Sequence, residues 1–271
     1  MRIALIADSH VSPRAPDCVQ NWCAASGVVA QAAPDFTVHL GDITLDGERN
    51  PEELSFAREL IDQWPTSMRC VPGNHDMGNG CGEEPLSDTH LGRYVAAVGA
   101  DRWVSHHEGW SLFGVNAQLL GSGTPAEAAQ WAWLDEQADA LAGDARSIVF
   151  VHRPLLRAEA DNSIRGGRYI APGSARRLLD GPLRRSLRLV ASGHTHQALD
   201  YPRDGVRHVW VPSCAFVFPD SRQPRIGEKR VGLGLLTLGS GEAHYELLST
   251  PALRQHDVTQ LPFFAALAAG R

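Results

Sequence analysis

Side chains that can bind divalent metal ions follow five separate apolar runs of the sequence. The clusters are Asp8 with His10, Asp42, Asn74 with His75, His152, and His194 with His196. They offer carboxylate, amide and imidazole donors without any cysteine, a set that suits intermediate divalent ions such as manganese, iron or zinc. Seven donors, leaving His75 aside, are too many for one tetrahedral ion. The sequence therefore predicts a site for two metal ions.

A two-metal site would be suited to phosphate chemistry. The two ions, about 3.5–4 Å apart, would share a carboxylate and a water. They carry about +4, the carboxylates of Asp8 and Asp42 carry about −2, and a bridging hydroxide carries about −1, which leaves a centre near +1. Such a centre attracts an anion and stabilises the negative charge that develops on phosphoryl oxygens. The prediction is metal-dependent hydrolysis of phosphate esters by a metal-bridging hydroxide.

Alternating strands and helices must position these clusters, because sites in open α/β sheets form at the carboxyl ends of the strands. Apolar runs predict strands over residues 2–7, 36–40, 68–71, 110–116, 147–151 and 187–191. Capping and proline signals predict helices over residues 18–32, 51–64, 88–98, 125–141 and 174–183. This alternation predicts an α/β fold.

Two local conformations are predicted near the first cluster. If the chain stays extended after residue 7, Asp8 and His10 point to the same side and can face one ion. Asp17 is a candidate N-cap for the helix over residues 18–32.

The last part of the chain is predicted to add antiparallel strands over residues 206–211, 231–238 and 242–248, in a second sheet. Without an internal repeat or a linker, residues 1–271 are expected to form a single domain that ends in an apolar tail from about residue 259. On a monomer this tail would need to be covered or would leave an exposed apolar patch, which predicts a homo-oligomer.

Composition and charge limit the class of protein. The chain has 271 residues, 43% of them hydrophobic, which is enough for a full core. A net charge of −6 argues against a broad nucleic-acid-binding face but not against a small anionic substrate. The five cysteines form neither a disulfide framework nor a zinc pattern, and no run resembles a signal peptide or a membrane span. We expect a cytoplasmic protein without extended nucleic acid or membrane among its partners.

Taken in order, the five clusters resemble the signature of the calcineurin-like metallophosphoesterase family. The chain carries D-x-H, G-D, G-N-H-D, H and G-H-x-H between residues 8 and 196. The resemblance implies a four-layer αββα sandwich of two mixed β-sheets flanked by helices, with two manganese or iron ions, or alternatively zinc or cobalt. Asp42 would bridge the ions, and His75 would contact the phosphate or protonate the leaving group. The implied ligands are Asp8, His10 and His196 for the first ion and Asn74, His152 and His194 for the second.

The chain lacks residues that are typical of other branches of the family, which argues against the activities of those branches. Protein serine/threonine phosphatases carry an arginine soon after the G-D block and a glutamate after G-N-H, whereas this chain lacks that arginine and has Asp76. Purple acid phosphatases carry a tyrosine where this chain has Leu45, and lipid A pathway pyrophosphatases carry an arginine where it has His75. The chain most resembles class III cyclic-nucleotide phosphodiesterases and glycerophosphodiesterases. The predicted substrates are small phosphodiesters of these two types.

Other functions of the same clusters stay open. A broad-specificity phosphomonoesterase or a nuclease would use the same ligands, whereas a non-enzymatic binding scaffold would be expected to lack some of them. The loop over residues 157–172 lies between two clusters and carries glycines together with Arg165 and Arg168. These arginines are predicted to contact the substrate, and the loop is predicted to close over the site.

Overall fold

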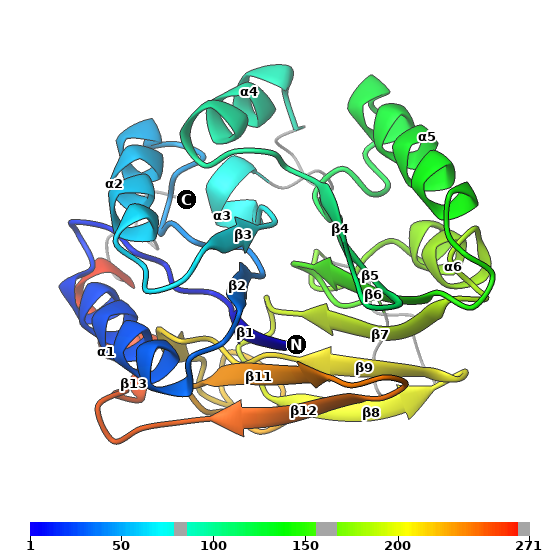
Figure 1. Ribbon diagram of the computed structural model, residues 1–271. Helices are drawn as coiled ribbons and strands as arrows, with labels where there is room; N and C mark the ends of the chain where they lie inside the picture. Colours follow the sequence, from blue (N-terminus) through cyan, green and yellow to red (C-terminus); the bar gives the residue numbers. More distant parts are fainter. Residues whose placement is uncertain (79–85, 156–166, 265–271) are drawn as a thin grey trace.

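The computed structural model describes residues 1–78, 86–155 and 167–264 and contains two large β-sheets (Figure 1). In spatial order, the first sheet consists of β12 (Ala243–Leu248), β11 (Leu233–Leu238), β1 (Arg2–Ile6), β2 (Phe36–His39) and β3 (Met68–Cys70). Strands β1, β2 and β3 are parallel. β11 is antiparallel to β1, and β12 is antiparallel to β11, so the sheet is mixed.

The second sheet is also mixed. In spatial order it consists of β4 (Trp103–His107), β5 (Trp110–Gly114), β6 (Arg146–Val151), β7 (Leu187–Ser192), β9 (Val206–Trp210) and β8 (Leu199–Arg203). Its inner strands β5, β6, β7 and β9 are parallel, and the edge strands β4 and β8 are antiparallel to them. Two short strands, β10 (Phe216–Val217) and β13 (His256–Asp257), pair separately.

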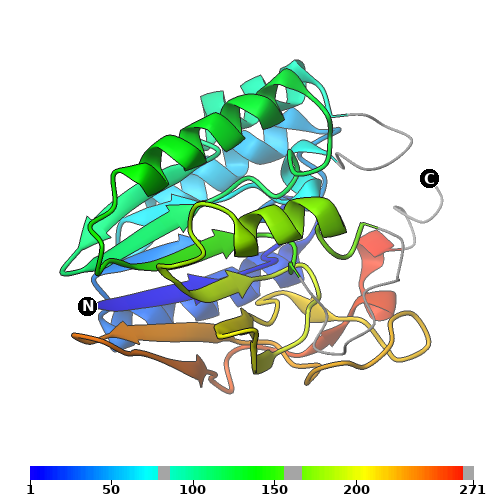
Figure 2. The same ribbon diagram turned by 90° about the vertical axis from the view of Figure 1, so that its right-hand side faces the viewer.

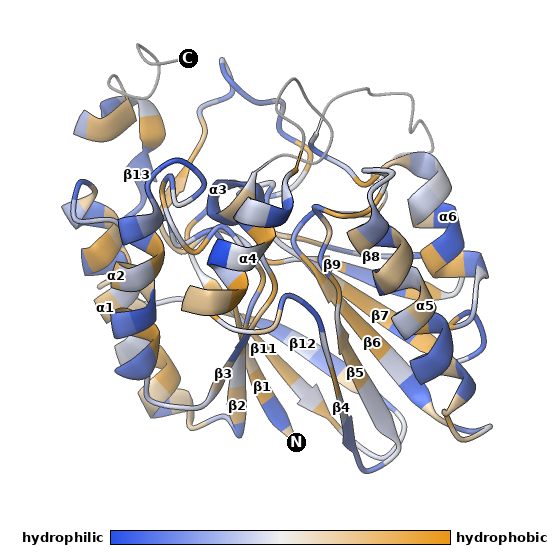
Figure 3. Cartoon of the chain, turned by 90° about the horizontal axis from the view of Figure 1, so that it is seen from above, coloured by the Kyte–Doolittle hydropathy of each residue, from blue (hydrophilic) through white to orange (hydrophobic). Residues whose placement is uncertain are grey.

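Helices cover the outer face of each sheet, as Figures 1 and 3 show. They are α1 (Pro16–Ala32), α2 (Pro51–Asp62) and α4 (Asp88–Ala97) on the first sheet, and α5 (Pro125–Asp139) and α6 (Pro172–Asp180) on the second. Leu5 and Phe150 meet in the core between the sheets. Ile6 packs in the core with α1 and α2, and Val149 packs in the core with α5 and α6. The predicted four-layer αββα sandwich is confirmed.

The late strands divide between the sheets instead of forming a second sheet of their own. β11 pairs with β1, with Arg2 opposite Thr237, so β11 and β12 extend the first sheet, whereas β9 joins the second. The edge strands β4 and β8 are present in the structure but were not predicted from the sequence. β8 alternates between partly buried and exposed residues and contains Pro202, a residue that sheets tolerate at an edge. It therefore has no apolar run that could be recognised in the sequence.

Helix α1 begins earlier than predicted. Pro16 is its first residue, a position that suits proline because no N–H is needed there. Asp17 lies in the first turn, and no side chain caps the helix, so the predicted capping role of Asp17 is wrong.

The described end of the chain packs on the same molecule. After the short helix η1 (Val258–Gln260), Leu261 and Phe263 are buried in one cluster with Phe216. This part of the tail is thus covered without a second copy of the chain. Residues 265–271 lie outside the described residues, and a homo-oligomer remains a prediction. Among the described residues, no helix is both long and apolar enough to cross a membrane.

Candidate metal centre

The predicted metal-binding side chains come together beyond the carboxyl ends of the strands. Figure 2 shows β1 running from the N-terminus towards the side of the molecule where the red segment around β13 lies. The clusters follow β1, β2, β3, β6 and β7, and Asn74 and His75 open the short helix α3 (Asn74–Met77). Three groups have donor atoms within 4.8 Å of one another: Asp8, His10 and His196; Asp42, His152 and His194; and His10, Asp42 and His75. Residues from distant parts of the chain therefore share one site.

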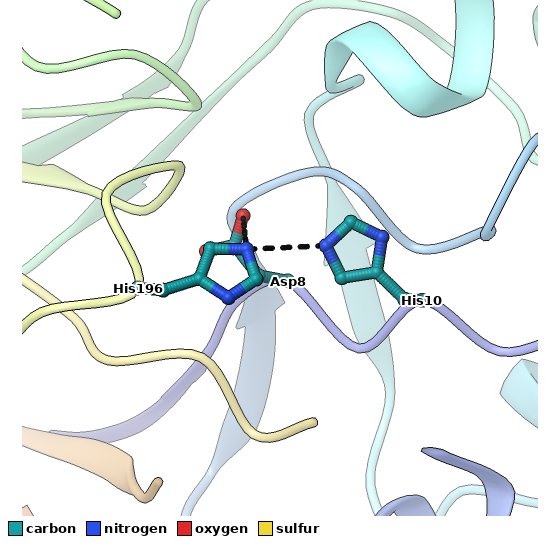
Figure 4. A group of neighbouring side chains, drawn as sticks. All are labelled: Asp8, His10 and His196. Carbon is teal, nitrogen blue, oxygen red and sulfur yellow. Dashed lines mark hydrogen bonds and ion pairs between the residues drawn. The ribbon is translucent and has the colours of Figure 1, made fainter. Parts of the chain in front are cut away.

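The first group places two imidazole nitrogens and a carboxylate together (Figure 4). His196 Nε2 lies 3.2 Å from His10 Nε2 and 3.6 Å from Asp8 Oδ1. A carbonyl can only accept a hydrogen bond, so His196 donates from Nδ1 to the Phe216 carbonyl over 2.9 Å, and its Nε2 carries a lone pair. A lone pair beside a carboxylate is repulsive. A divalent cation among these atoms would remove the repulsion, so the donor set fits a metal ion.

The second group is centred on His152. Its Nδ1 donates to the Leu40 carbonyl over 2.9 Å, so in the neutral ring Nε2 would present a lone pair to the site. Burial opposes protonation of this ring, but the neighbouring Asp42 carboxylate raises the pKa of His152 above its usual value. Around Nε2 lie His194 Nδ1 at 3.0 Å, Asn74 Oδ1 at 3.2 Å and Asp42 Oδ2 at 3.3 Å. Two oxygens and a second imidazole nitrogen thus lie within 3.3 Å of Nε2, and this donor set fits a cation that would take the place of a proton on His152.

Asp42 lies between the two groups. Its Oδ2 is 4.0 Å from His10 Nε2 and 3.3 Å from His152 Nε2. Its Oδ1 accepts a hydrogen bond of 2.8 Å from the backbone N–H of His75. One carboxylate is therefore within reach of both donor groups, the position that a bridging ligand requires.

Burial keeps three of the imidazoles neutral. It lowers the pKa of His10 and of His194 well below the usual value and the pKa of His196 to about 4. The rings are uncharged near neutral pH, which is the state in which histidine binds a metal ion.

The two carboxylates respond differently to the same environment. Burial opposes ionisation of Asp42, but the neighbouring His152 and His75 hold its pKa well below the usual range. Burial raises the pKa of Asp8 well above its usual value, and the negative charge of Asp42 adds to the rise. Two carboxylates in one buried site thus repel each other, and a divalent cation would offset that repulsion.

Strained backbone conformations concentrate in the site. Of the eight non-glycine residues with positive φ in the described parts of the chain, five belong to it. They are Asp8, His10, Asp42, His194 and His196. Such conformations cost about 1–3 kcal/mol each and gather at functional sites. They persist because the surrounding structure holds them.

The first cluster illustrates this point and corrects a prediction. β1 ends at Ile6, and φ is 51° at Asp8 and 46° at His10, so the predicted extended conformation is wrong. Asp8 N donates to the Gly41 carbonyl over 3.0 Å. His10 N donates to the Asp42 carbonyl over 3.1 Å. The loop after β2 therefore sets the direction of both side chains.

Two motif glycines let the G-D and G-N-H-D loops touch. A Cβ on Gly73 would lie 2.1 Å from both N and Oδ1 of Asp42. Its φ of −102° suits any residue, so the close approach alone requires glycine there. A Cβ on Gly41 would lie 2.8 Å from His152 Nδ1, and the φ of 92° also favours glycine. The motif glycines thus permit the approach that places Asp42 against the second donor group.

Replacing Gly73 by alanine is expected to displace Asp42 and to lower kcat/KM by about 10²-fold or more, the effect of a misplacement of roughly 1 Å. Gly27→Ala is the matched control, because Gly27 is exposed in α1 and a Cβ there meets nothing within 4 Å. That control should gain about 0.5–1 kcal/mol of stability. Hydrolysis of bis-p-nitrophenyl phosphate and thermal denaturation measure the two effects. Full activity of Gly73→Ala would contradict the close approach.

Asp76 ties the same two loops together. Its carboxylate accepts hydrogen bonds from the backbone N–H groups of Gly73 at 2.9 Å, Ile43 at 3.2 Å and Thr44 at 2.8 Å. Asp76 therefore orients the loops that carry Asp42 and the G-N-H-D motif.

The arginines near the site occupy different environments. Arg165 lies within residues 156–166, outside the described residues, and Arg168 is partly buried just after that stretch. Their contact with substrate and the closure of the loop remain predictions. Arg153, which directly follows His152, is 1% exposed and is thus buried.

Phe216 is a part of the site that the sequence analysis missed. Its carbonyl orients His196, and its ring stacks on His10 at a centroid distance of 4.9 Å and lies 4.7 Å from the ring of His196. No motif or periodicity distinguishes this residue in the sequence. Only the fold of the segment after β9 brings it to the ligands.

Comparison with known proteins agrees with this geometry. A model of the calcineurin-like phosphoesterase family matches residues 1–198, a range that includes every cluster. The chain is 25% identical over 251 residues to a probable cyclic nucleotide phosphodiesterase of Synechococcus sp., covering 83% of this chain and 84% of that protein.

Two solved structures illustrate the likeness of fold. A dimetal phosphatase from Danio rerio has a TM-score of 0.62 at 16% identity, with 92% of this chain and 99% of that chain covered. GAP50, the anchor in the inner membrane complex of Plasmodium, has a TM-score of 0.66 at 14% identity, with 94% and 86% covered. The family match extends over most of the chain, and we conclude that this protein belongs to the calcineurin-like phosphoesterase family.

Proposed function

We propose that this protein is a dinuclear metal-dependent phosphodiesterase, and the position of Asp42 between the two donor groups carries the proposal. Asp8, His10 and His196 would hold one ion, Asn74, His152 and His194 would hold the other, and Asp42 would serve both. Manganese or iron suits these oxygen and imidazole donors, with zinc or cobalt as alternatives. When bound, two such ions supply a polarised phosphoryl group and an activated water.

His75 is proposed to donate a proton to the leaving group. Its Nδ1 lies 2.6 Å from the Leu45 carbonyl, so the proton on that nitrogen is engaged and Nε2 remains for the substrate. The ring stands edge-on to that of His10 at a centroid distance of 4.8 Å. To act as a general acid the ring must also carry a proton on Nε2, so the donating form would be the imidazolium, held through Nδ1 by the backbone carbonyl.

The proposed substrates are small phosphodiesters of the cyclic-nucleotide or glycerophosphodiester type. The relative named a probable cyclic nucleotide phosphodiesterase supports the diester assignment. The net charge of −6 disfavours polynucleotides, whereas the cationic centre attracts a small anion.

Substrate profiling of the manganese-loaded protein tests this function. We expect kcat/KM for cyclic AMP or glycerophosphoethanolamine to exceed that for AMP, a monoester, by at least about tenfold. EDTA should abolish the activity, and manganese should restore it. Hydrolysis that favours AMP, or that favours single-stranded DNA over both diesters, would contradict the proposed substrate class.

A further inference from the structure

The segment over residues 216–227 lies against the proposed metal centre and is hydrogen-bonded to the chain beside it. Gln197, which follows the proposed ligand His196, is buried and donates from Nε2 to Gln223 Oε1 at 2.9 Å and to the Pro224 carbonyl at 3.1 Å. Its Oε1 accepts from the backbone N–H groups of Ile226 and Gly227, both at 2.8 Å. The segment is thus fixed to the chain directly beside a ligand.

A charged pair supports the same segment. Lys229 is buried, its ammonium lies 2.8 Å from Asp220 Oδ1, and it also donates to the Gln223 carbonyl. These contacts and those of Gln197 fix the part of the segment that directly follows residues 218–222 and tie Asp220 to Lys229. Preorganisation of this kind favours recognition of a ligand, because little ordering is required on binding.

Two phenylalanines of this segment line the centre but differ in exposure. Phe216 is 3% exposed and its ring packs on His10 and His196, so it has no free face. Phe218 is only partly buried. Its ring contacts that of His196 in a T-shaped arrangement at 5.0 Å and that of Phe216 at 5.7 Å. Phe218 is therefore a partly exposed aromatic residue whose ring contacts that of a proposed metal ligand.

The aromatic cluster extends beyond Phe218. Phe264 is partly buried in the same cluster as Phe216 and Phe218, and the exposed guanidinium of Arg222 lies 5.9 Å from the Phe264 ring centroid. A border of aromatic rings and a guanidinium forms few favourable contacts with a glycerol or ethanolamine group. It suits a flat, π-rich group, which stacks on phenylalanine whatever its hydrogen-bonding pattern.

We infer that Phe218 stacks on the nucleobase of the substrate, which makes the substrate a nucleotide diester and excludes a glycerophosphodiester. The inference rests on the proposed function, because the phosphate must lie at the metal centre for the base to lie at Phe218. In a nucleotide the ribose separates phosphate and base. Phe218 is not itself a proposed metal ligand, but its ring contacts that of the proposed metal ligand His196. It is therefore placed to meet the base. Stacking on one aromatic ring contributes about 5- to 150-fold to affinity.

Comparing AMP with ribose 5-phosphate isolates the contribution of the base, since the two share the phosphate and the ribose. In titration calorimetry on the manganese-loaded protein, AMP should bind at least about fivefold more tightly. Phe218→Ala should bring the affinity for AMP down to that for ribose 5-phosphate, and Phe218→Tyr should restore the difference. Phe56→Ala, at a partly buried phenylalanine of α2, is the matched control and should keep the wild-type preference.

The outcomes separate this inference from the proposed function. Equal binding of AMP and ribose 5-phosphate by the wild type, or a preference for AMP that survives in Phe218→Ala, would overturn the role of Phe218. In that case hydrolysis of diesters by the wild type would still support the phosphodiesterase. A preference for AMP that depends on Phe218, in a protein that hydrolyses no diester, would support the nucleobase contact and reject the catalytic proposal.

Discussion

Replacing Asp42 by asparagine is expected to lower kcat/KM on phosphodiesters by on the order of 10³-fold. The carboxylate lies 4.0 Å from His10 Nε2 and 3.3 Å from His152 Nε2, so its loss weakens both proposed ion sites at once. Asparagine keeps an oxygen that can accept the 2.8 Å hydrogen bond from the backbone of His75, so the loop keeps its support. Elemental analysis should show the fall in metal content that accompanies the loss of activity.

The matched control is Asp200→Asn, which removes one negative charge from an exposed pair with Arg207 on the second sheet. It should change activity by no more than about twofold, because exposed pairs contribute little.

Thermal denaturation in EDTA and in manganese gives a second measurement. A ligand at 100 times its Kd stabilises a protein by about 2.7 kcal/mol, and we expect a gain of this order for the wild type and a much smaller gain for Asp42→Asn. Comparing the gain within each variant cancels any change in intrinsic stability. An Asp42→Asn variant that retained two ions and the full gain would overturn the bridging assignment.

Replacing His75 by alanine is expected to slow hydrolysis of cyclic AMP by about 10²–10⁴-fold and hydrolysis of bis-p-nitrophenyl phosphate far less. A ribose alkoxide is a strong base and needs a proton to leave, whereas p-nitrophenolate is a weak base and leaves without one. Steady-state kinetics on the two substrates measure the difference.

Metal content should survive this substitution. The contact between residue 75 and Asp42 Oδ1 is made by the backbone N–H, which alanine retains. His244→Ala on β12 removes an exposed histidine distant from the clusters in sequence and is the matched control. An equal loss on both phosphodiesters would assign His75 to phosphate binding or to the geometry of the site, and the general-acid role would have to be abandoned.

Local patterns were enough to predict most elements of the fold. Buried parallel strands such as β1 and β6 read as continuous apolar runs, and prolines begin α2 and α5 as expected. The same patterns failed where pairing partners decide the structure. β11 lies in the first sheet only because it pairs with β1, more than two hundred residues earlier in the chain. Periodicity predicts a strand and its buried face, but it does not indicate which other strand will pair with it.

The donor types, their order and their place after successive strands could be predicted from the sequence, and with them the family and the class of chemistry. The family resemblance implied how the donors group and that Asp42 bridges them, and the structure supplies the distances between these side chains. No sequence pattern indicates that backbone carbonyls at Leu40 and Phe216 fix the orientation of two histidine rings. Only the tertiary structure placed Phe218 beside His196. Donor chemistry belongs to each residue alone, whereas distances, lone-pair directions and left-handed backbone angles arise from contacts between segments far apart in the chain.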